Sequence, residues 1–371
     1  MKINLRTQAV IDAFKKRTSA IDPELRNRLV RTEDYNYASY VIGIEQLVRE
    51  IIKSNKIFFI GKNELGRHTV ASKNPDFLEK IYSCITSDLA KSIAFVFPMH
   101  NFNPYVDLFI KNANDKLGYD LGLYLSRNFR DVGLHSYNNE YDRYDDLVMT
   151  VDMLNEFIDR IRRKGECPKF KKLIANYQSN IIKNNRGLVD YINYLFNQHS
   201  SLLVLRVDFG YTIYHCKDKD EIDKMYEQAQ KDRKNFINDK PNSIFEHRVG
   251  YAWKLEYCRF KGFYYQMFFF FDGPKIQQDI NRVMMIGEDI GEYWKTTITE
   301  GKGLYFNYND LASRSRRYPG YPGIGMINRD DHNRRNELEK AVGDLMKPDY
   351  YAKIDAPGKE KTFSRGEILK P

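Results

Sequence analysis

The feature that most constrains the fold is a strongly aromatic segment that a short turn divides into two strands. Residues 251–272 read YAWKLEYCRFKGFYYQMFFFFD. The runs 250–258 and 263–271 are rich in aromatic residues, which favour strands, and the connection Arg259-Phe260-Lys261-Gly262 ends in glycine, as tight turns often do. Four consecutive phenylalanines, 268–271, are typical of a strand that is buried on both faces. We therefore predict a largely buried antiparallel hairpin.

The segments around the hairpin predict an α+β fold. Residues 201–211, SLLVLRVDFGY, are mostly apolar and β-branched, which indicates a largely buried strand. Arg206 and Asp208 interrupt the apolar pattern at two alternate positions. Apolar periodicity, turn residues and proline stops predict helices over 218–240, 275–298 and 333–347 and a short strand over 303–308. The order strand, helix, hairpin, helix, strand, helix predicts one antiparallel sheet with packed helices.

The first half of the chain has a polar, helical pattern. Apolar residues recur at spacings of three and four over 34–55 and 144–164, and a further helix is expected at 186–198. Residues 57–60 and 93–97 are short apolar runs that suit either strands or helix ends. We divide the 371 residues into three parts: a mainly helical N-terminal region, 1–199, an α+β domain, 200–355, and a C-terminal tail, 356–371.

Charge and cysteine content narrow the class of protein. The formal net charge is +9, which favours a polyanionic partner without requiring one. The four cysteines show no CxxC or Cys/His spacing, which predicts reduced, mostly buried thiols. The N-terminus lacks an apolar signal core and no window is long enough to span a bilayer, so we expect a cytoplasmic protein without membrane association. The sequence does not indicate an oligomeric state.

Common enzyme signatures are absent from the sequence. It contains no phosphate-loop GxxxxGK[ST], no GxSxG and no HExxH. Its seven histidines show no ligand spacing.

Several motifs occur in the order found in a known family. They are RVDFGY, GYAWKLEY, FKGFYYQMFFFFDG, IGEYWKTTITEGKGLYFNYND, and finally LEKAVGDLMKPDYYAKI followed by KTFSRG. Over roughly 200–366 the chain resembles the replication proteins of filamentous phages (inoviruses) and prophages, the YagK/YfjJ C-terminal type. The resemblance implies kinship with rolling-circle initiators of the HUH superfamily, which recognise origin DNA and nick it.

The resemblance also implies a metal site. In such initiators two histidines flanking a hydrophobic residue, often with a carboxylate on the neighbouring strand, hold Mg²⁺ or Mn²⁺, which polarises the scissile phosphate. Here the triplet falls at Tyr264-Tyr265-Gln266, so both histidines are absent. Glu256 lies eight residues before Tyr264, and the hairpin is expected to place the two opposite each other. A site made of Glu256, Gln266 and Tyr264 would bind a divalent cation weakly.

Each of these residues also has an ordinary structural interpretation. Glu256 is either a ligand or a carboxylate satisfied by a nearby Arg or Lys. Gln266 is either a carbonyl ligand or a buried amide with hydrogen-bond partners. Tyr264 and Tyr265 either pack in the core or stack on a DNA base.

The attacking tyrosine that the resemblance implies belongs to a YxxK motif on a later helix. In this chain Asp344 occupies the position of that tyrosine, and Lys347 is retained. A carboxylate cannot form the tyrosyl ester to DNA. Tyr350 and Tyr351 would serve only if the helix changed register, which Pro348 disfavours. The residues at the expected metal-ligand positions and the residue at the nucleophile position thus both differ from the family's motifs.

A basic loop is the best nucleic-acid feature outside the hairpin. Residues 313–335 read SRSRRYPGYPGIGMINRDDHNRR. Arginines in such a loop can lie along phosphates while tyrosines stack on bases, although a solvated surface loop has the same composition. The candidate contacts are Arg314, Arg316, Arg317, Tyr318, Tyr321, Arg334 and Arg335.

These observations lead to one preferred function and two alternatives. We expect an initiator-like protein of a bacterial phage or mobile element that binds single-stranded or origin DNA and has lost or weakened nicking activity. One alternative is an active nickase that uses Mg²⁺ or Mn²⁺ at Glu256 and Gln266 with Tyr350 or Tyr351 as nucleophile. The other is a protein-interaction module without a role on DNA. Neither the DNA sequence recognised nor the role of residues 1–199 follows from the sequence.

Overall fold

The computed structural model describes the chain in two compact units. It describes all residues except 1–7, 18, 23–27, 32–34, 55–58, 65–66, 73–79, 82, 86–88, 129–143, 213–218, 239–242, 260, 277–279, 310–322 and 369–371. Residues 1–35 and 180–371 form the first, here the sheet unit, and residues 36–179 form the second, the helical unit. Each unit has its own buried core.

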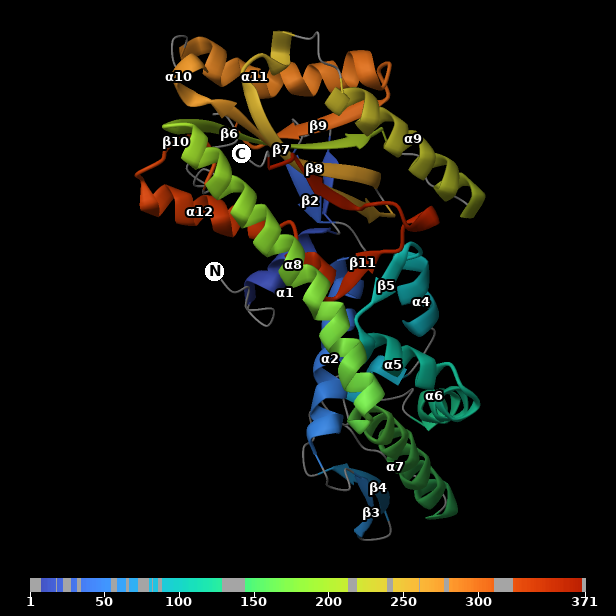
Figure 1. Cartoon of the computed structure of the whole chain (residues 1–371). Helices are drawn as coiled ribbons and strands as arrows, with labels where there is room; N and C mark the ends of the chain where they lie inside the picture. The colour runs from blue at the N-terminus through green and yellow to red at the C-terminus, as the bar shows by residue number, and fades with distance from the viewer. Residues whose placement is uncertain are drawn as a thin grey trace. The chain divides into compact units, whose positions relative to one another are not determined.

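The sheet unit is built on a six-stranded antiparallel sheet (Figure 1). Its strands are β6 (Ser201–Tyr211), β7 (Arg248–Cys258), β8 (Gly262–Asp272), β9 (Gly303–Asn307), β10 (Gly325–Asn328) and β12 (Phe363–Arg365). The order is β10-β6-β8-β7-β12, with β9 also paired to β6. The predicted hairpin is the β7–β8 pair. The α+β fold class, with an antiparallel sheet, packed helices and a helical N-terminal region, is confirmed.

Strand register gives the sheet two different faces. Directly paired residues of antiparallel strands share a face, and neighbours along a strand alternate between faces. One face, here the aromatic face, carries Phe209, Tyr265 and Leu255, which are paired across β6, β8 and β7. The other, here the polar face, carries Asp208, Gln266 and Lys254 in the next row.

Helices and a π-helical turn cover the aromatic face. Figure 1 shows α9 (Lys219–Asn238) and α11 (Ile280–Tyr293) along this side of the sheet. Phe236 of α9 is fully buried. The centroid of its ring lies 5.0 Å from the ring centroid of Phe209, 6.1 Å from that of Phe269 and 5.4 Å from that of Trp294. Trp294 opens the π-helical turn Trp294–Ile298, and its indole Nε1 donates to Gly210 O at 3.0 Å. Aromatic packing and the hydrogen bond of the Trp294 indole therefore hold the helices against the sheet.

The polar face is covered by elements from both ends of the chain. They include α1 (Gln8–Arg17), the C-terminal part of α8 (Pro168–Gln198), α12 (His332–Gly343) and the short 3₁₀ helix η3 (Lys347–Tyr350). A side chain at Gly250 would place its Cβ 2.6 Å from the Tyr191 hydroxyl, so glycine there permits the close approach of α8 to β7. The sheet unit also contains β1 (Ser19–Asp22), β2 (Arg28–Arg31), η1 (Ser243–Phe245), α10 (Gly273–Ile276), β11 (Ala352–Ile354) and η4 (Pro357–Lys359).

The helical unit has a mainly apolar core that also buries a few polar side chains, among them Asn112 and Thr150. Its elements are α2 (Tyr35–Lys53), β3 (Phe59–Glu64), β4 (Arg67–Ser72), α4 (Leu89–Val96), β5 (His100–Phe102), α5 (Pro104–Ala113), α6 (Lys116–Asn128), α7 (Tyr144–Glu166) and the start of α8. Asn103 begins α5, since its Oδ1 accepts from the backbone N–H groups of Tyr105 and Val106 at 3.1 and 3.0 Å.

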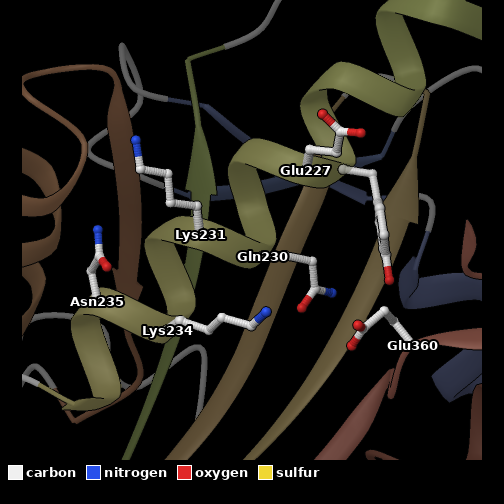
Figure 2. A pocket seen from close by; sticks show the side chains of 7 residues that line it. Glu227, Gln230, Lys231, Lys234, Asn235 and Glu360 are labelled. Atoms are coloured by element: carbon white, nitrogen blue, oxygen red, sulfur yellow. The ribbon is translucent and has the colours of Figure 1, made fainter. Parts of the chain in front are cut away.

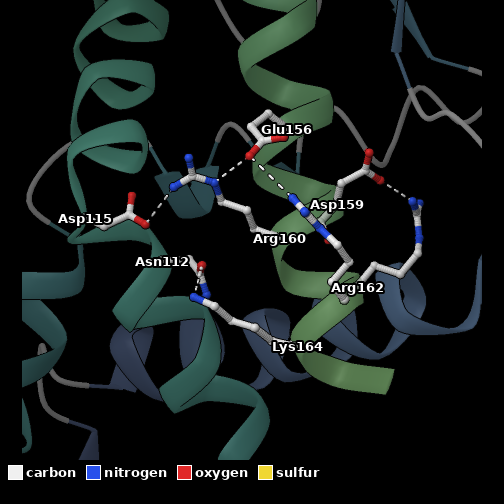
Figure 3. A network of polar contacts seen from close by, with 8 residues as sticks. Asn112, Asp115, Glu156, Asp159, Arg160, Arg162 and Lys164 are labelled. Atoms are coloured by element: carbon white, nitrogen blue, oxygen red, sulfur yellow. Dashed lines mark hydrogen bonds and ion pairs between the residues drawn. The ribbon is translucent and has the colours of Figure 1, made fainter. Parts of the chain in front are cut away.

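A polar network on α7 joins it to α5 and to the residue before α6 (Figure 3). Arg160 Nε donates to Glu156 at 2.7 Å, and its Nη1 donates to Asp115 at 3.3 Å. One turn further on, Lys164 Nζ donates to Asn112 Oδ1 at 2.9 Å. These contacts fix the side-by-side packing of helices, although each exposed ion pair contributes only about 0–1 kcal/mol.

Most predicted elements are close to those observed. The helix expected over 34–55 is α2, and the one over 144–164 is α7. The helix expected at 186–198 is the end of the much longer α8. Of the two ambiguous apolar runs, 57–60 includes the start of β3, and 93–97 forms the end of α4. Among the described cysteines Cys84 and Cys258 are buried and Cys167 is exposed.

None of the helices in the described part of the chain is both long and apolar enough to span a membrane.

Truncation of Phe236 tests the aromatic face. We expect Phe236→Ala to lower the free energy of unfolding of the sheet unit by about 3–5 kcal/mol, because it leaves a cavity among five aromatic rings. Both tryptophans, Trp253 and Trp294, lie in this unit, so urea unfolding followed by tryptophan fluorescence reports on it. Met285→Ala, at a 57% exposed position of α11, is the control and should change little. Equal losses for the two variants would contradict the assigned core.

Candidate functional site

A row of polar residues crosses the centre of the sheet on its polar face. Asp208 of β6 pairs with Gln266 of β8, which pairs in turn with Lys254 of β7. Gln266 Nε2 donates to Asp208 Oδ2 at 3.4 Å. Asp208 and Lys254 are 5% and 0% exposed, which is unusual for charged residues and requires that each have charged or hydrogen-bonding partners.

The ammonium group of Lys254 is held by a carboxylate from η3. Lys254 Nζ lies 2.8 Å from Asp349 Oδ1 and 2.9 Å from Oδ2, and Asp349 is itself buried. The same Nζ is 3.9 Å from Glu256 Oε1. Lys254 therefore lies between two carboxylates, one from its own strand and one from a segment 95 residues further along the chain.

Glu256 and Tyr264 face each other across the hairpin. Their Cα pairing in the register of β7 and β8 confirms the arrangement expected from their spacing. Lys261, in the turn, places its Nζ 4.3 Å from the centroid of the Tyr264 ring, a cation–π contact. Burial lowers the pKa of Lys261, while the thiol of Cys258 and the carboxylates of Asp208 and Glu256 oppose that shift.

Arg206 and Tyr308 complete the polar face beside Asp208. The Arg206 guanidinium lies 4.2 Å from the centroid of the Tyr308 ring, and its Nε is 3.6 Å from Asp208 Oδ1. The Tyr308 hydroxyl donates to Asp208 Oδ2 at 3.1 Å. Tyr308 is only half-buried, so its phenol combines access to solvent with contact to a buried carboxylate.

Six charged side chains of this face lie close together. We call the following residues the polar cluster: three cations and three carboxylates that come from β6, β7, the hairpin turn and η3, namely Arg206, Lys254, Lys261, Asp208, Glu256 and Asp349. A buried set of charges is tolerated only when it is compensated in this way.

The residues present do not fit the Mg²⁺ or Mn²⁺ that the family resemblance implies. A hard divalent cation needs several oxygen ligands at about 2.0–2.6 Å. Glu256 has the Lys254 ammonium beside it, and Tyr264 has the Lys261 ammonium over its ring. Gln266 presents its amide N–H to Asp208. Two fixed positive charges would repel the metal, and the described residues contain no group of three or more His, Cys, Asp or Glu side chains suited to hold one.

The segment expected to carry the nucleophile lies at the end of α12. Asp344 is the C-cap of that helix, and Lys347 donates to its carboxylate. Tyr350 and Tyr351 are 2% and 3% exposed, and their rings are in edge contact at 4.9 Å. The Tyr351 ring also packs 5.1 Å from Phe14 of α1. It is Asp349, between these residues, that reaches the polar cluster.

The expected DNA-contacting arginines fall into two groups. Arg314, Arg316, Arg317, Tyr318 and Tyr321 lie outside the described residues. Arg334 donates to Ile324 O at 2.7 Å, and Arg335 donates to Arg329 O at 2.9 Å and to Asn193 Oδ1 at 2.8 Å. These two guanidinium groups therefore already bind the protein's own carbonyl groups.

A pocket lies between α9 and the C-terminal segment. Its volume is about 380 Å³, and its lining includes Glu227, Lys231, Lys234 and, from the C-terminal segment, Glu360 (Figure 2). Figure 2 shows Lys234 pointing toward the Glu360 side of the pocket and Lys231 pointing away. Two acids and two lysines give the pocket no preference for a ligand of either charge.

An exposed basic surface in the helical unit was missed by the sequence analysis. The end of α7 and the start of α8 carry five exposed cations within ten residues, and we call them the basic corner: Arg163, Lys164, Lys169, Lys171 and Lys172. Its signal was the local charge of RIRRKGECPKFKK at 160–172, where Glu166 is the sole acid. Lys254, Lys261, Asp349 and Tyr308 were missed as well, because each depends on a contact between strands or with a distant segment.

Residues 165–309 match the family model of the YagK/YfjJ C-terminal domain. The match supports the family resemblance found in the motifs and extends it toward the N-terminus to include all of α8. It contains β6, β7, β8 and β9 and five of the six members of the polar cluster, all but Asp349, and it ends before α12 and η3. No curated protein and no solved structure gives a significant match.

Removal of the Asp349 charge tests the polar cluster. We expect Asp349→Asn to lower the free energy of unfolding by about 3–5 kcal/mol, because it leaves the Lys254 ammonium buried beside an incomplete set of partners. Asp344→Asn is the matched control: the Asp344 side chain is 34% exposed, so the loss should be about 0–1 kcal/mol. Urea unfolding measures both, and a loss as small for Asp349 as for Asp344 would show that the buried pair is not needed.

Proposed function

We propose that the chain is a DNA-binding protein of a bacterial phage or mobile element, related to replication initiators, in which metal-dependent nicking is lost or weakened. The match to the YagK/YfjJ C-terminal domain is compatible with such an origin. The observation that carries the proposal is the position of Lys254 Nζ, between Asp349 and Glu256 on the face where the resemblance implies the metal.

The loss of cutting follows from the chemistry that nicking requires. A divalent cation withdraws charge from the scissile phosphate while a phenol oxygen attacks it. An ammonium group carries one charge instead of two and is already engaged by the Asp349 carboxylate. Tyr350 and Tyr351, the tyrosines nearest to the expected nucleophile position, are almost fully buried. Both parts of the reaction are therefore impaired.

Binding to DNA is supported by where the positive charge is exposed. The polar cluster is neutral overall, so it contributes little to the net charge of +9. The basic corner presents five cations to solvent, and the segment with Arg314, Arg316 and Arg317 adds three more in sequence. Surfaces of this kind bind the phosphate backbone in a salt-dependent manner with little dependence on base sequence.

Substitution of the basic corner tests DNA binding. We expect the triple change of Lys169, Lys171 and Lys172 to Ala to weaken binding to labelled single-stranded DNA and to reduce the slope of log K against log salt by about 2. The control is the same triple change at Lys224, Lys231 and Lys234 of α9, which are exposed but interspersed with acids. Fluorescence anisotropy at several salt concentrations measures both. Wild-type protein without salt-sensitive binding would instead favour a protein-interaction module.

One observation favours an active nickase as a second candidate. Tyr308 is half-buried and donates its hydroxyl to Asp208 on the same sheet face as Gln266. The adjacent Arg206 guanidinium could stabilise a phosphate or the developing phenolate. If nicking survives, Tyr308 is therefore better placed for attack than the buried Tyr350 or Tyr351.

A suicide-cleavage assay decides between these two functions. We expect wild-type protein to form no covalent adduct with labelled single-stranded origin DNA in the presence of Mn²⁺, because the Lys254 ammonium lies between Asp349 and Glu256 and disfavours a metal there. An adduct on a denaturing gel would contradict the loss of nicking. Its disappearance in Tyr308→Phe, with Tyr350→Phe and Tyr351→Phe as controls, would then identify the nucleophile.

A further inference from the structure

The ammonium group of Lys254 has the surroundings of a bound cation. It is fully buried, it contacts both oxygens of Asp349 at 2.8 and 2.9 Å, and Glu256 Oε1 lies 3.9 Å away. Gln266 lies directly across the strand pair from it, and Glu256 lies across from Tyr264. The residues expected as metal ligands therefore lie on the same face of the sheet as this nitrogen, in two adjacent rows of paired residues.

We propose that Lys254 is an internal replacement for a divalent cation, and that its ammonium group blocks a latent metal site formed by Glu256, Asp349 and the carbonyl oxygen of Gln266. Oxygen ligands of this type, two carboxylates and an amide, suit Mg²⁺ and Mn²⁺. The site is latent because a lysine charge stabilises the two carboxylates permanently and repels a competing metal. The proposal concerns the interior of the sheet unit and holds whether or not the protein binds DNA.

The charges nearest to Lys254 explain why one substitution should open the site. With Lys254 in place its ammonium lies 2.8 Å from Asp349 and 3.9 Å from Glu256, so an added divalent ion would have to occupy a position that a positive charge already holds. Without the Lys254 charge, the two carboxylates that flanked the ammonium lose the cation that lies between them. Buried carboxylates that lose their counter-charge gain a strong preference for a cation.

The test measures Mn²⁺ binding by Lys254→Met, whose side chain keeps much of the lysine volume and removes the charge. We expect this variant to deplete the electron paramagnetic resonance signal of free Mn²⁺ and to gain about 3–6 °C in Tm at tenfold excess over its dissociation constant. Wild-type protein should show neither effect. Lys347→Met, the same change beside the single carboxylate of Asp344, is the matched control and should also show neither.

Three results would overturn the proposal. The first is a folded Lys254→Met variant without Mn²⁺ affinity. The second is retention of that affinity after Glu256→Gln is added to it, since Glu256 would then not be a ligand. The third is Mn²⁺ binding by wild-type protein that Glu256→Gln abolishes, because the metal would then coexist with Lys254.

Folding failure of the variant does not leave the question open. A Lys254→Met variant that folds only when Mn²⁺ is present supports the proposal, since the metal then supplies the missing charge. If it folds under neither condition, Lys254→Gln, which keeps an N–H donor for Asp349, replaces it in the same measurements. The wild-type titration is independent of both variants.

Discussion

The buried contact between Lys254 and Asp349 is the constraint on which the arrangement of the polar face depends. An ammonium group without solvent requires a carboxylate at hydrogen-bonding distance, and here both oxygens of one carboxylate are used. Because Asp349 belongs to η3, this requirement places the end of the chain against the central hairpin. The neighbouring Pro348, Tyr350 and Tyr351 are buried as a consequence.

The two faces of one sheet solve different physical problems. On the aromatic face, Phe209, Tyr265 and Phe269 gain stability by removing apolar area from water, and α9 and α11 supply the covering surface. On the polar face, charges are buried and must be balanced one by one, which depends on geometry more strictly than apolar packing does. A substitution on the aromatic face therefore leaves a cavity, whereas one on the polar face leaves a charge.

Much of the fold was predictable because its signals are local. The turn at Lys261-Gly262 and the eight-residue separation of Glu256 and Tyr264 were enough to give the hairpin register. Arg206 and Asp208 stand at alternate positions of an apolar strand, which already indicated that one face is polar. The partner of Lys254 was not predictable, because a contact over 95 residues depends on how the last third of the chain returns to the sheet. The same reason explains why Tyr308, whose phenol meets Asp208 only through the pairing of β9 with β6, was overlooked.

Charge neutrality on the polar face has a consequence for any interaction with DNA. Opposite charges a few ångströms apart cancel at longer range, and salt screens what remains beyond about 10 Å. Arg206, Lys254 and Lys261 therefore cannot supply the attraction that a phosphate backbone needs. Attraction must come from cations without buried counter-charges, such as Lys169, Lys171 and Lys172. In this chain the residues that stabilise the sheet and the exposed cations of the basic corner are thus separate sets, so either can change without loss of the other.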